Sequence, residues 1–417
     1  MRFALYKKIF ELERSIKMKK SIYFLMCFSM ALLFLFGCSQ NSGSDFSLIS
    51  PSGSGEIDCL ITNANVVDVI EGRVLSGYTL AIKDGNIADM YNTEESSYQA
   101  DTIINANGMF IVPGFINTHV HIGSEGLQLK TWAASGVTTI RNLADTDDGL
   151  LLSKKDKFNE DVFNATMLSS TPIITKPGGY GRGYIDSPEE AIEMVRVQAA
   201  KGVDVIKISI EDILQGKTWP MLTFDEVKAL TDEAHKQGLR VCAHVTKTAK
   251  LQIAIDAGVD EIAHMVVERV PNAMIKQMIK QDMMWIPTME LWKGVSEEYN
   301  INDYTIALDN LNRFYKKGGM VVFGTDFGGF TTPFDDKFPI TEVRCLQEAG
   351  MSNQDIIKAG TCNAAYSCRI LDTTGTIENG KLADMIICSE NPMENMDALT
   401  EPLYVMHKGT IVLEPVN

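Results

Sequence analysis

Two histidines, His119 and His121, stand one residue apart at the end of the apolar stretch "FIVPGFINTHVHIG", residues 110–123. The whole chain of 417 residues has only six histidines. Residues two apart on a strand point to the same side, so both imidazoles face one region. Imidazole is the commonest metal ligand among side chains, and this spacing therefore predicts a metal site. The alternative is that both histidines are structural, with their hydrogen-bonding groups paired inside the protein.

Further residues of metal-binding type stand at the ends of later strand-like segments. His244 ends residues 239–245, His264 ends residues 259–265, and Asp326 ends "MVVFGTD". With Lys207, the set offers enough nitrogen and oxygen ligands for two divalent ions. Two ions about 3.5–4 Å apart can share one hydroxide, which is a nucleophile at neutral pH.

Lys207 lies near the end of the segment "VDVIKIS", two residues after Val205 and four after Val203. The three side chains therefore point to the same side of a strand. The Lys207 amine is accordingly predicted to point inward, where an unpaired ammonium is costly and tends to lose its proton. A neutral amine can add carbon dioxide to give a carbamate with two oxygen ligands. The alternative is an ordinary ammonium paired with a carboxylate, with one metal bound.

These residues must be positioned by an alternating chain of strands and helices. Helix starts are indicated at "DSPEEAIEMV" and at the Thr223–Glu226 capping box. Near-continuous apolar strands that alternate with helices are typical of parallel strands buried on both faces. The fold class is predicted to be α/β, a (β/α)8 TIM barrel over residues 113–372, whose strand ends carry the reactive groups. A doubly wound sheet is the alternative, but no GxGxxG turn follows the first strand. The predicted strands are residues 115–120, 137–142, 164–170, 203–209, 239–245, 259–265, 283–289 and 320–326.

Both ends of the chain read as short strands and turns, including the hairpin signal "KDGN" at residues 83–86. Residues 56–112 and 373–417 are therefore predicted to form one small composite β-sandwich domain.

Residues 1–38 are predicted to be a targeting segment, with Met18 as an alternative start of the chain. Its basic start and apolar run indicate a secretory signal, and "LFGC" resembles the lipobox of bacterial lipoproteins. The resemblance implies lipidation at Cys38 and an exported protein anchored to the bacterial membrane. A plain transmembrane anchor is the alternative. The Ser- and Gly-rich residues 39–55 are predicted to be a flexible tether.

The charge of the chain limits its partners. With 38 basic and 54 acidic residues the net charge is −16, which disfavours a nucleic acid partner. Eight cysteines are scattered without CxxC spacing, so neither a zinc knuckle nor a disulfide framework is predicted. The sequence leaves the oligomeric state open, a homo-oligomer included.

The chain after Cys38 resembles the amidohydrolase superfamily. "VPGFINTHVHIG" matches its strand-one signature, and "GVTTIRN" and the tail "NAAYSCRILDTTGTIENGKLADMIICSENPMENMDAL" extend the likeness. The nearest branch resembles imidazolonepropionases and Xaa-Pro or Xaa-Arg dipeptidases. The resemblance implies two metal ions, with zinc the first expectation and manganese, cobalt, nickel or iron open. It implies that His119, His121 and Asp326 bind the first ion, that His244 and His264 bind the second, and that carboxylated Lys207 bridges them.

The predicted function is hydrolysis of an amide C–N bond in a small substrate, such as a dipeptide or an N-acyl amino acid. Asp326 would accept the proton of the attacking hydroxide and deliver it to the leaving amine. Tyr180, in the glycine-rich loop "TKPGGYGRGYID", is expected to donate a hydrogen bond to the tetrahedral oxygen. Arg182 or Arg141 is expected to pair with a substrate carboxylate.

Other functions remain alternatives. Cyclic amide hydrolysis, as in imidazolonepropionase, and lactone hydrolysis use the same metal pair. Deamination is disfavoured, because "HVTK" puts Lys247 where the deaminases carry a glutamate. A binding lipoprotein without catalysis is disfavoured because no metal ligand is missing.

Overall fold

The computed structural model describes residues 48–49, 56–92, 98–123, 125–144, 149–214, 216–330 and 332–415. The predicted signal segment with Met18 and Cys38 lies outside the described residues, as does most of the predicted tether. None of the helices in the described ranges is long and apolar enough to cross a membrane.

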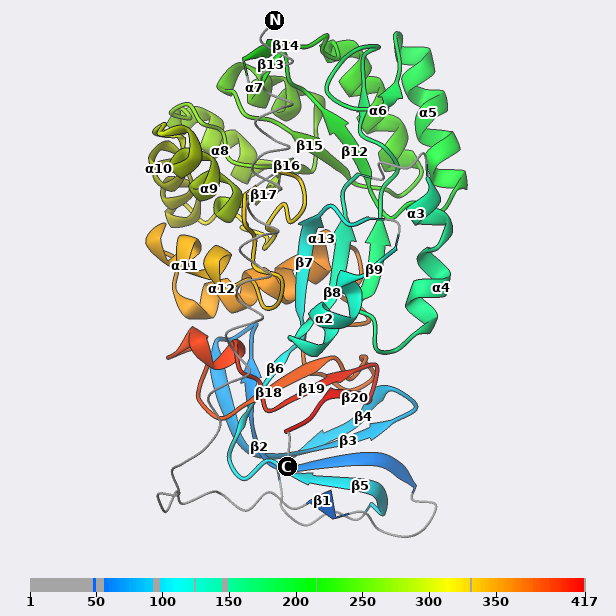
Figure 1. The fold of residues 1–417 in the computed structure, drawn as a ribbon, viewed down its shortest axis with the longest axis vertical. Helices are drawn as coiled ribbons and strands as arrows, with labels where there is room; N and C mark the ends of the chain where they lie inside the picture. The colour runs from blue at the N-terminus through cyan, green and yellow to red at the C-terminus, as the bar shows by residue number, and fades with distance from the viewer. Residues whose placement is uncertain are drawn as a thin grey trace, which may run out of the picture. The chain divides into compact units, whose positions relative to one another are not determined.

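Both ends of the chain supply strands to one hydrogen-bonded sheet of nine strands (Figure 1). Strand β2 pairs with β5 along its first half, with β6 further on, and with β3 in the antiparallel sense. The β3–β4 hairpin turns at Asp84 and Gly85, whose φ angles of 49° and 80° are those that the predicted "KDGN" turn requires. β1 falls within the predicted tether. The strands are β1 Leu48–Ile49, β2 Ile57–Asp68, β3 Arg73–Lys83, β4 Asn86–Tyr91, β5 Ala100–Asn105, β6 Phe110–Pro113, β18 Met385–Cys388, β19 Tyr404–His407 and β20 Thr410–Leu413.

The middle of the chain forms parallel strands in two further sheets. The first sheet has the order β7-β8-β9, and the second has the order β11-β10-β12-β15-β16-β17. Each of the first seven predicted strands contains one of these strands. The short strands β10 and β11 lie in the glycine-rich loop, where no strand was predicted. The strands are β7 Phe115–Val120, β8 Val137–Asn142, β9 Thr166–Ser169, β10 Ile174–Thr175, β11 Gly183–Tyr184, β12 Ile206–Ser209, β15 Val241–His244, β16 Glu261–Ala263 and β17 Met284–Ile286.

The eighth predicted strand, residues 320–326, forms isolated parallel bridges instead of a regular strand. Val321 is bridged to Trp285 of β17, and Phe327 is bridged to Val120 of β7. Backbone hydrogen bonds run on both sides, from Val322 N–H to Trp285 O at 3.0 Å and from Thr118 N–H to Phe323 O at 3.0 Å. This segment therefore lies between the last strand of the second sheet and the first strand of the first sheet.

Helices follow most of the parallel strands and lie around their outer side (Figure 1). Two predicted helix starts are confirmed: Ser187 caps α5 ahead of Pro188, and Thr223 with Glu226 forms a capping box on α6. The helices are α2 Gln128–Ala134, α3 Leu150–Ser153, α4 Lys155–Glu160, α5 Pro188–Ala200, α6 Phe224–Lys236, α7 Thr248–Ala257, α8 Asn272–Lys280, α9 Met289–Tyr299, α10 Asp303–Lys316, α11 Ile340–Glu348, α12 Asn353–Gly360, α13 Cys362–Ser367 and the 3-10 turn Met396–Leu399. Strands β13 Ile213–Leu214 and β14 Lys217–Thr218 form a separate antiparallel pair.

The parallel strands are buried on both faces, as their apolar runs predict. Every residue of β7, β8, β12 and β15 is buried, including the polar ones. Polar side chains that end these strands therefore lie in a region largely closed to water.

Candidate active site

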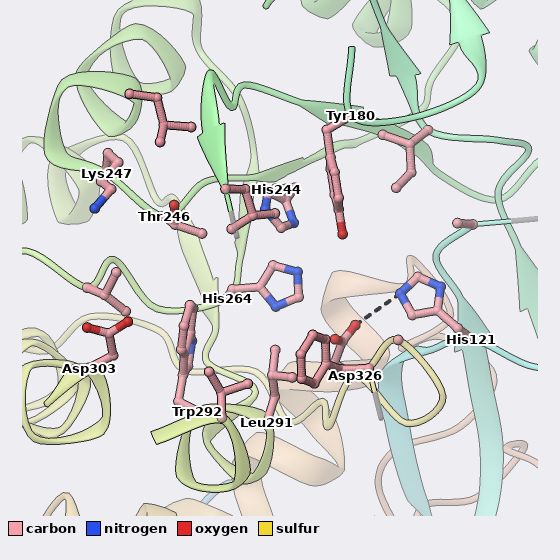
Figure 2. A pocket seen from close by; sticks show the side chains of 18 of the residues that line it. His121, Tyr180, His244, Thr246, Lys247, His264, Leu291, Trp292, Asp303 and Asp326 are labelled. Atoms are coloured by element: carbon pink, nitrogen blue, oxygen red, sulfur yellow. Dashed lines mark ion pairs between the residues drawn. The ribbon is translucent and has the colours of Figure 1, made fainter. Parts of the chain in front are cut away.

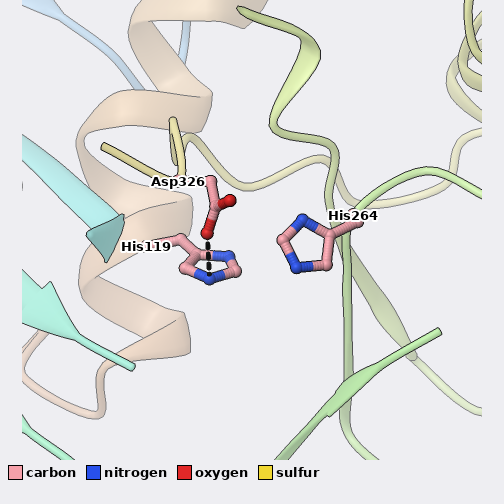
Figure 3. Close-up of side chains that lie close together, drawn as sticks. All are labelled: His119, His264 and Asp326. Carbon is pink, nitrogen blue, oxygen red and sulfur yellow. Dashed lines mark ion pairs between the residues drawn. The ribbon is translucent and has the colours of Figure 1, made fainter. Parts of the chain in front are cut away.

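The structure brings five of the six predicted metal ligands into direct proximity. His119, His264 and Asp326 each offer a ligand atom within 4.8 Å of the others (Figure 3). His121 Nε2 lies 3.0 Å from Asp326 Oδ1, the same oxygen that His119 Nε2 approaches at 3.0 Å. The ring of His244 lies with its centroid 4.5 Å from that of His264. Side chains that are up to 207 positions apart in the chain thus share one small volume.

Lys207, the sixth predicted ligand, lines the same cavity as His121, His244, His264 and Asp326. It lies in β12, in register with Cys242 of the neighbouring strand β15. Its side chain is 1% exposed, and its amine has no hydrogen-bond partner among the described residues. No carboxylate in the described ranges lies within ion-pair distance of this amine, so the alternative of a simple Lys–carboxylate pair finds no partner there.

The backbone at the strand ends aims the ligands in unusual directions. The φ angle is 69° at His264, 48° at Thr288 and 65° at Asp326. These values lie in the left-handed region, which residues other than glycine rarely adopt. Such strained conformations persist only where surrounding contacts hold them, and they cluster at functional sites. Asp326 is held by a hydrogen bond from its N–H to the carbonyl of His119, 2.8 Å long.

Neighbouring side chains fix the orientation of the imidazoles. His264 Nδ1 shares a 3.0 Å hydrogen bond with Thr288 Oγ1, which leaves Nε2 of that ring for a ligand. Trp285 donates its indole N–H to the carbonyl of His264 at 2.7 Å.

Glu211, which was not singled out from the sequence, lies against His244. Its Oε2 is 3.8 Å from His244 Nε2 and accepts a 2.5 Å hydrogen bond from Thr246 Oγ1. Glu211 is 1% exposed, and its Oε1 has no partner in the described part of the chain. A glutamate just after a strand gives no signal in the sequence, because most such residues are solvated.

Burial controls the protonation of the cluster. It lowers the pKa of His244 to about 3, and it holds the pKa of both His119 and His264 well below the ordinary value, so all three imidazoles are neutral. Burial also lowers the pKa of Lys207. Burial opposes ionisation of Asp326, but the neighbouring imidazoles outweigh it, with His119 Nε2 and His121 Nε2 each 3.0 Å from Oδ1, and hold the pKa of this carboxyl well below the usual range. Neutral imidazoles, a carboxylate and a less basic amine are the protonation states that metal binding requires.

Several buried polar atoms of the cluster lack hydrogen bonds within the described residues. In native proteins such atoms are rare and call for an explanation, such as a bound ion. Nitrogen and carboxylate oxygen donors of this kind suit zinc and other first-row divalent metals. The donor set therefore fits a metal centre. The atoms without a hydrogen bond include His119 Nδ1 and Nε2, Lys207 Nζ, His244 Nε2 and Asp326 Oδ1, although His119 Nε2 and Asp326 Oδ1 face each other at 3.0 Å.

The cluster opens into a cavity of ≈ 790 Å³ (Figure 2). Tyr180 lies over the cluster, with its ring centroid 4.8 Å from that of His244 and 5.7 Å from that of Trp219. Burial, together with the charges of Asp326 and Glu211, raises the pKa of Tyr180 to about 12. Its hydroxyl therefore keeps its proton and can act as a hydrogen-bond donor.

The two predicted substrate arginines lie in different surroundings. Arg182 is exposed in the glycine-rich loop and borders a second, shallower hollow beside Tyr180, Tyr184 and Trp219. Arg141 is 1% exposed and does not line the cavity; its guanidinium binds Glu261 and the carbonyl of Thr118. The expectation that Arg141 pairs with a substrate carboxylate is corrected accordingly, because its donors already serve a buried partner.

Comparison with known proteins places this site in a family. The Amidohydrolase family matches residues 110–412. An ochratoxinase of Aspergillus niger is 27% identical over 403 residues, covering 81% of this chain and 82% of the relative. An imidazolonepropionase of Thermoanaerobacter pseudethanolicus is 25% identical over 390 residues, covering 80% and 88%. The crystal structure of a Xaa-Pro dipeptidase with bound methionine superposes with a TM-score of 0.75 at 24% identity, covering 85% of this chain and 99% of that one.

The chain belongs to the amidohydrolase family, as the sequence resemblance predicted. The structural likeness to the dipeptidase indicates a TIM-barrel-like fold. The family and its hydrolase relatives make the chain a hydrolase of carbon–nitrogen bonds that acts on a small molecule. The family is generally metal-dependent, in agreement with the donor set described above.

Proposed function

We propose that the chain is a binuclear metal-dependent amidohydrolase that cleaves an amide C–N bond in a dipeptide or an N-acyl amino acid. One observation carries the proposal: neutral imidazoles, a carboxylate and a partnerless amine converge at the ends of parallel strands. A structural role would have left these buried atoms paired with one another or with the backbone.

The chain offers two groups of ligands. His119, His121 and Asp326 would hold one ion, since both imidazoles approach the same carboxylate oxygen. His244 and His264 would hold the second. Lys207, carboxylated by carbon dioxide, would bridge the two, because its amine is buried, has a lowered pKa and lacks a partner in the described ranges. We propose zinc for both ions, with manganese, cobalt, nickel and iron compatible with the same donors.

When bound, the ions supply a water of lowered pKa and polarise the amide carbonyl. The protein's own groups perform the proton transfers. Asp326 is ionised, so its carboxylate can accept a proton from the attacking water and then deliver it to the departing nitrogen. Tyr180, which stays protonated, donates a hydrogen bond to the oxygen that gains charge. Arg182, which borders the second hollow beside Tyr180, is the remaining candidate for binding a substrate carboxylate.

The fold and the location of the chain are part of the same proposal. We propose that the segment 320–327 closes the parallel strands into a (β/α)8 barrel over residues 113–372, supported by its bridges to β17 and β7. We propose that residues 56–112 and 373–417 fold as a composite β-sandwich domain. We also propose export and lipidation at Cys38, supported by the sequence of residues 1–38. Metabolic labelling with a palmitate analogue should mark the chain and fail to mark Cys38→Ser; labelling of both would remove the lipoprotein assignment.

The test of catalysis measures metal content and turnover together. Protein grown in metal-supplemented medium should hold nearly two ions per chain and release free amine from a panel of dipeptides and N-acyl amino acids, followed by mass spectrometry. A chain that holds no metal and hydrolyses no amide would instead be a binding protein.

A cyclic amide is the second candidate substrate, because an imidazolonepropionase is among the relatives that match over most of both chains. Lactams and lactones in the same panel separate the two possibilities. Turnover confined to ring opening would replace the linear amide as substrate.

A further inference from the structure

One face of helix α9 turns apolar side chains toward the cavity. Leu291, Val295 and Tyr299 are spaced four residues apart, which places them in one row along the helix, and all three line the cavity. Their exposure increases toward the end of the helix: Leu291 is 7% exposed, Val295 is half-buried and Tyr299 is 55% exposed. The row thus begins in the core beside Trp292 and ends in solvent at the mouth.

Other segments extend this apolar surface around the mouth of the cavity. Ile301, just after α9, is 45% exposed, and Ile213 of β13 is 54% exposed. Phe330, which follows Asp326 by four residues, places its ring 6.3 Å from the ring of Tyr299. We call Ile213, Tyr299, Ile301 and Phe330 the apolar rim; all four line the cavity.

Three of the four rim side chains are exposed and Phe330 is half-buried, and an apolar cluster of this kind around a cavity is typical of a surface that a ligand covers. Two charged side chains, Lys247 and Asp303, also line this end of the cavity (Figure 2). Their charges are opposite, so neither sign dominates there.

We infer that the apolar rim and the α9 row form a subsite for a bulky aliphatic or aromatic acyl group, so that the substrate is an amide of a large apolar acid. This inference rests on the proposed function and deepens it: among linear amides, the cavity selects a long-chain N-acyl amino acid over a small dipeptide. The scissile carbonyl lies at the metal centre, and the acyl chain runs along α9 toward the mouth, where its end displaces water from the rim.

The first experiment measures kcat/KM for N-acetyl-, N-butyryl-, N-hexanoyl- and N-octanoyl-L-alanine with the metal-loaded protein. Each added methylene that reaches the subsite should raise kcat/KM about fourfold, from the transfer free energy of a buried methylene. In Ile301→Ser, the octanoyl substrate should lose roughly three- to tenfold in kcat/KM, and the loss should become smaller as the acyl chain is shortened. Ile70→Ser is the matched control, because Ile70 is also 45% exposed but lies in the β2–β3 turn, outside the cavity lining. A flat response to chain length, or equal losses in both variants, would overturn the inference.

A second measurement does not depend on turnover. N-phenyl-1-naphthylamine, a neutral apolar dye, should bind the metal-loaded protein with a higher fluorescence than Ile301→Ser gives, and octanamide should displace it where acetamide does not. If amides are hydrolysed without chain-length preference and octanamide displaces no dye, the subsite is absent and the proposed function stands. If nothing is hydrolysed but dye binding is weakened only by Ile301→Ser, the subsite stands and the proposed function fails.

Discussion

Two groups of buried polar side chains lie in or beside the parallel strands, and their hydrogen bonding differs. Arg141 of β8 donates Nη2–H to Glu261 Oε2 at 2.6 Å and Nε–H to the carbonyl of Thr118 at 2.9 Å. Ser367 donates to the other oxygen of Glu261 at 2.7 Å. In contrast, Lys207 and several atoms of the histidine cluster have no partner in the described ranges. Burial and charge alone therefore do not distinguish the two groups; the number of buried polar atoms left without a hydrogen bond does.

The ion pair of Arg141 and Glu261 is expected to contribute to stability, and the histidine cluster to activity. A buried ion pair with full hydrogen bonding holds its strands together, and removal of one partner leaves an uncompensated charge. The histidine cluster, in which Lys207 Nζ, His119 Nδ1 and His244 Nε2 lack hydrogen bonds within the described residues, contributes fewer such bonds and retains these donors for a ligand. Substitutions in the two groups should therefore separate stability from catalysis.

The largest expected effect is on turnover, in Lys207→Met. If Lys207 bridges the two ions, this variant should lose at least about 10³-fold in kcat and hold about half of the metal. The midpoint of thermal unfolding of the metal-free protein should stay the same or rise, because an unpaired buried amine is replaced by an apolar side chain. Metal analysis, kinetics and calorimetry check these results. Full activity would end the bridging role of Lys207.

The next effect is on stability, in Arg141→Met. Loss of the guanidinium leaves Glu261 buried without its cation, which should cost about 3–5 kcal/mol of unfolding free energy. Urea denaturation of the metal-free protein measures it. The double variant Arg141→Met, Glu261→Gln should recover much of the loss. A single variant as stable as the parent would show that the pair does not stabilise the fold.

A third buried set, Glu290 and Glu342, is intermediate between the two groups. Glu290 Oε1 accepts from Asp335 N–H at 2.8 Å and Glu342 Oε2 from Glu290 N–H at 2.6 Å, while each second oxygen lacks a partner among the described residues. Burial raises the pKa of both carboxyls from 4.5 to about 8.

These raised pKa values predict a loss of stability with rising pH. Both carboxyls hold protons in the folded chain, so their contribution is complete below about pH 4.5 and is lost as the pH rises through 8. Between pH 6 and 9 the unfolding free energy should fall by an amount on the order of a few kcal/mol. Thermal unfolding across this range should show a smaller fall in Glu342→Gln; an identical fall in that variant would contradict the assignment.

The smallest expected effect is on metal affinity, in Glu211→Gln. Glu211 Oε2 lies 3.8 Å from His244 Nε2, so its negative charge would face the ion that this imidazole binds, and loss of an outer-shell carboxylate typically costs 10- to 100-fold in metal affinity (about 1.4–2.8 kcal/mol). Competition with a chromophoric chelator measures the affinity. Asp212→Asn is the matched control, since Asp212 is the next residue and its carboxylate pairs with Lys250 at 2.5 Å. Equal affinity in the two variants would exclude Glu211 from the site.

Much of the site was predictable because its signals are local. His119 and His121 stand two residues apart, and each of His244, His264 and Asp326 ends an apolar run. Both patterns can be recognised from the two-residue period of a strand. The capping residues of α5 and α6 were predictable for the same reason, since a cap depends on residues three positions apart. The structure brings five of these six ligands into mutual proximity, with Lys207 lining the same cavity.

What could not be predicted depends on distant partners. Arg141 is not available to a substrate because its guanidinium binds Glu261. Glu261 lies 120 positions later, so no local sequence pattern predicts this pair. The role of Glu211 depends on its distance to His244 across two strands. The left-handed backbone at His264 and Asp326 is held by neighbouring segments, and the residue types alone do not predict it, because most Asp and His residues have negative φ.

The bond from the Asp326 amide to the His119 carbonyl joins the beginning and the end of the catalytic region. Asp326 is the last of the candidate ligands along the chain of 417 residues. More than three quarters of the polypeptide must therefore be synthesised before all of the candidate ligands are present. Metal cannot be captured in its final coordination during early synthesis, and any shortened product that ends before residue 326 would lack a complete centre. If the chain binds metal as proposed, loading would be a late event, and the ions available where folding finishes would influence which metal is bound.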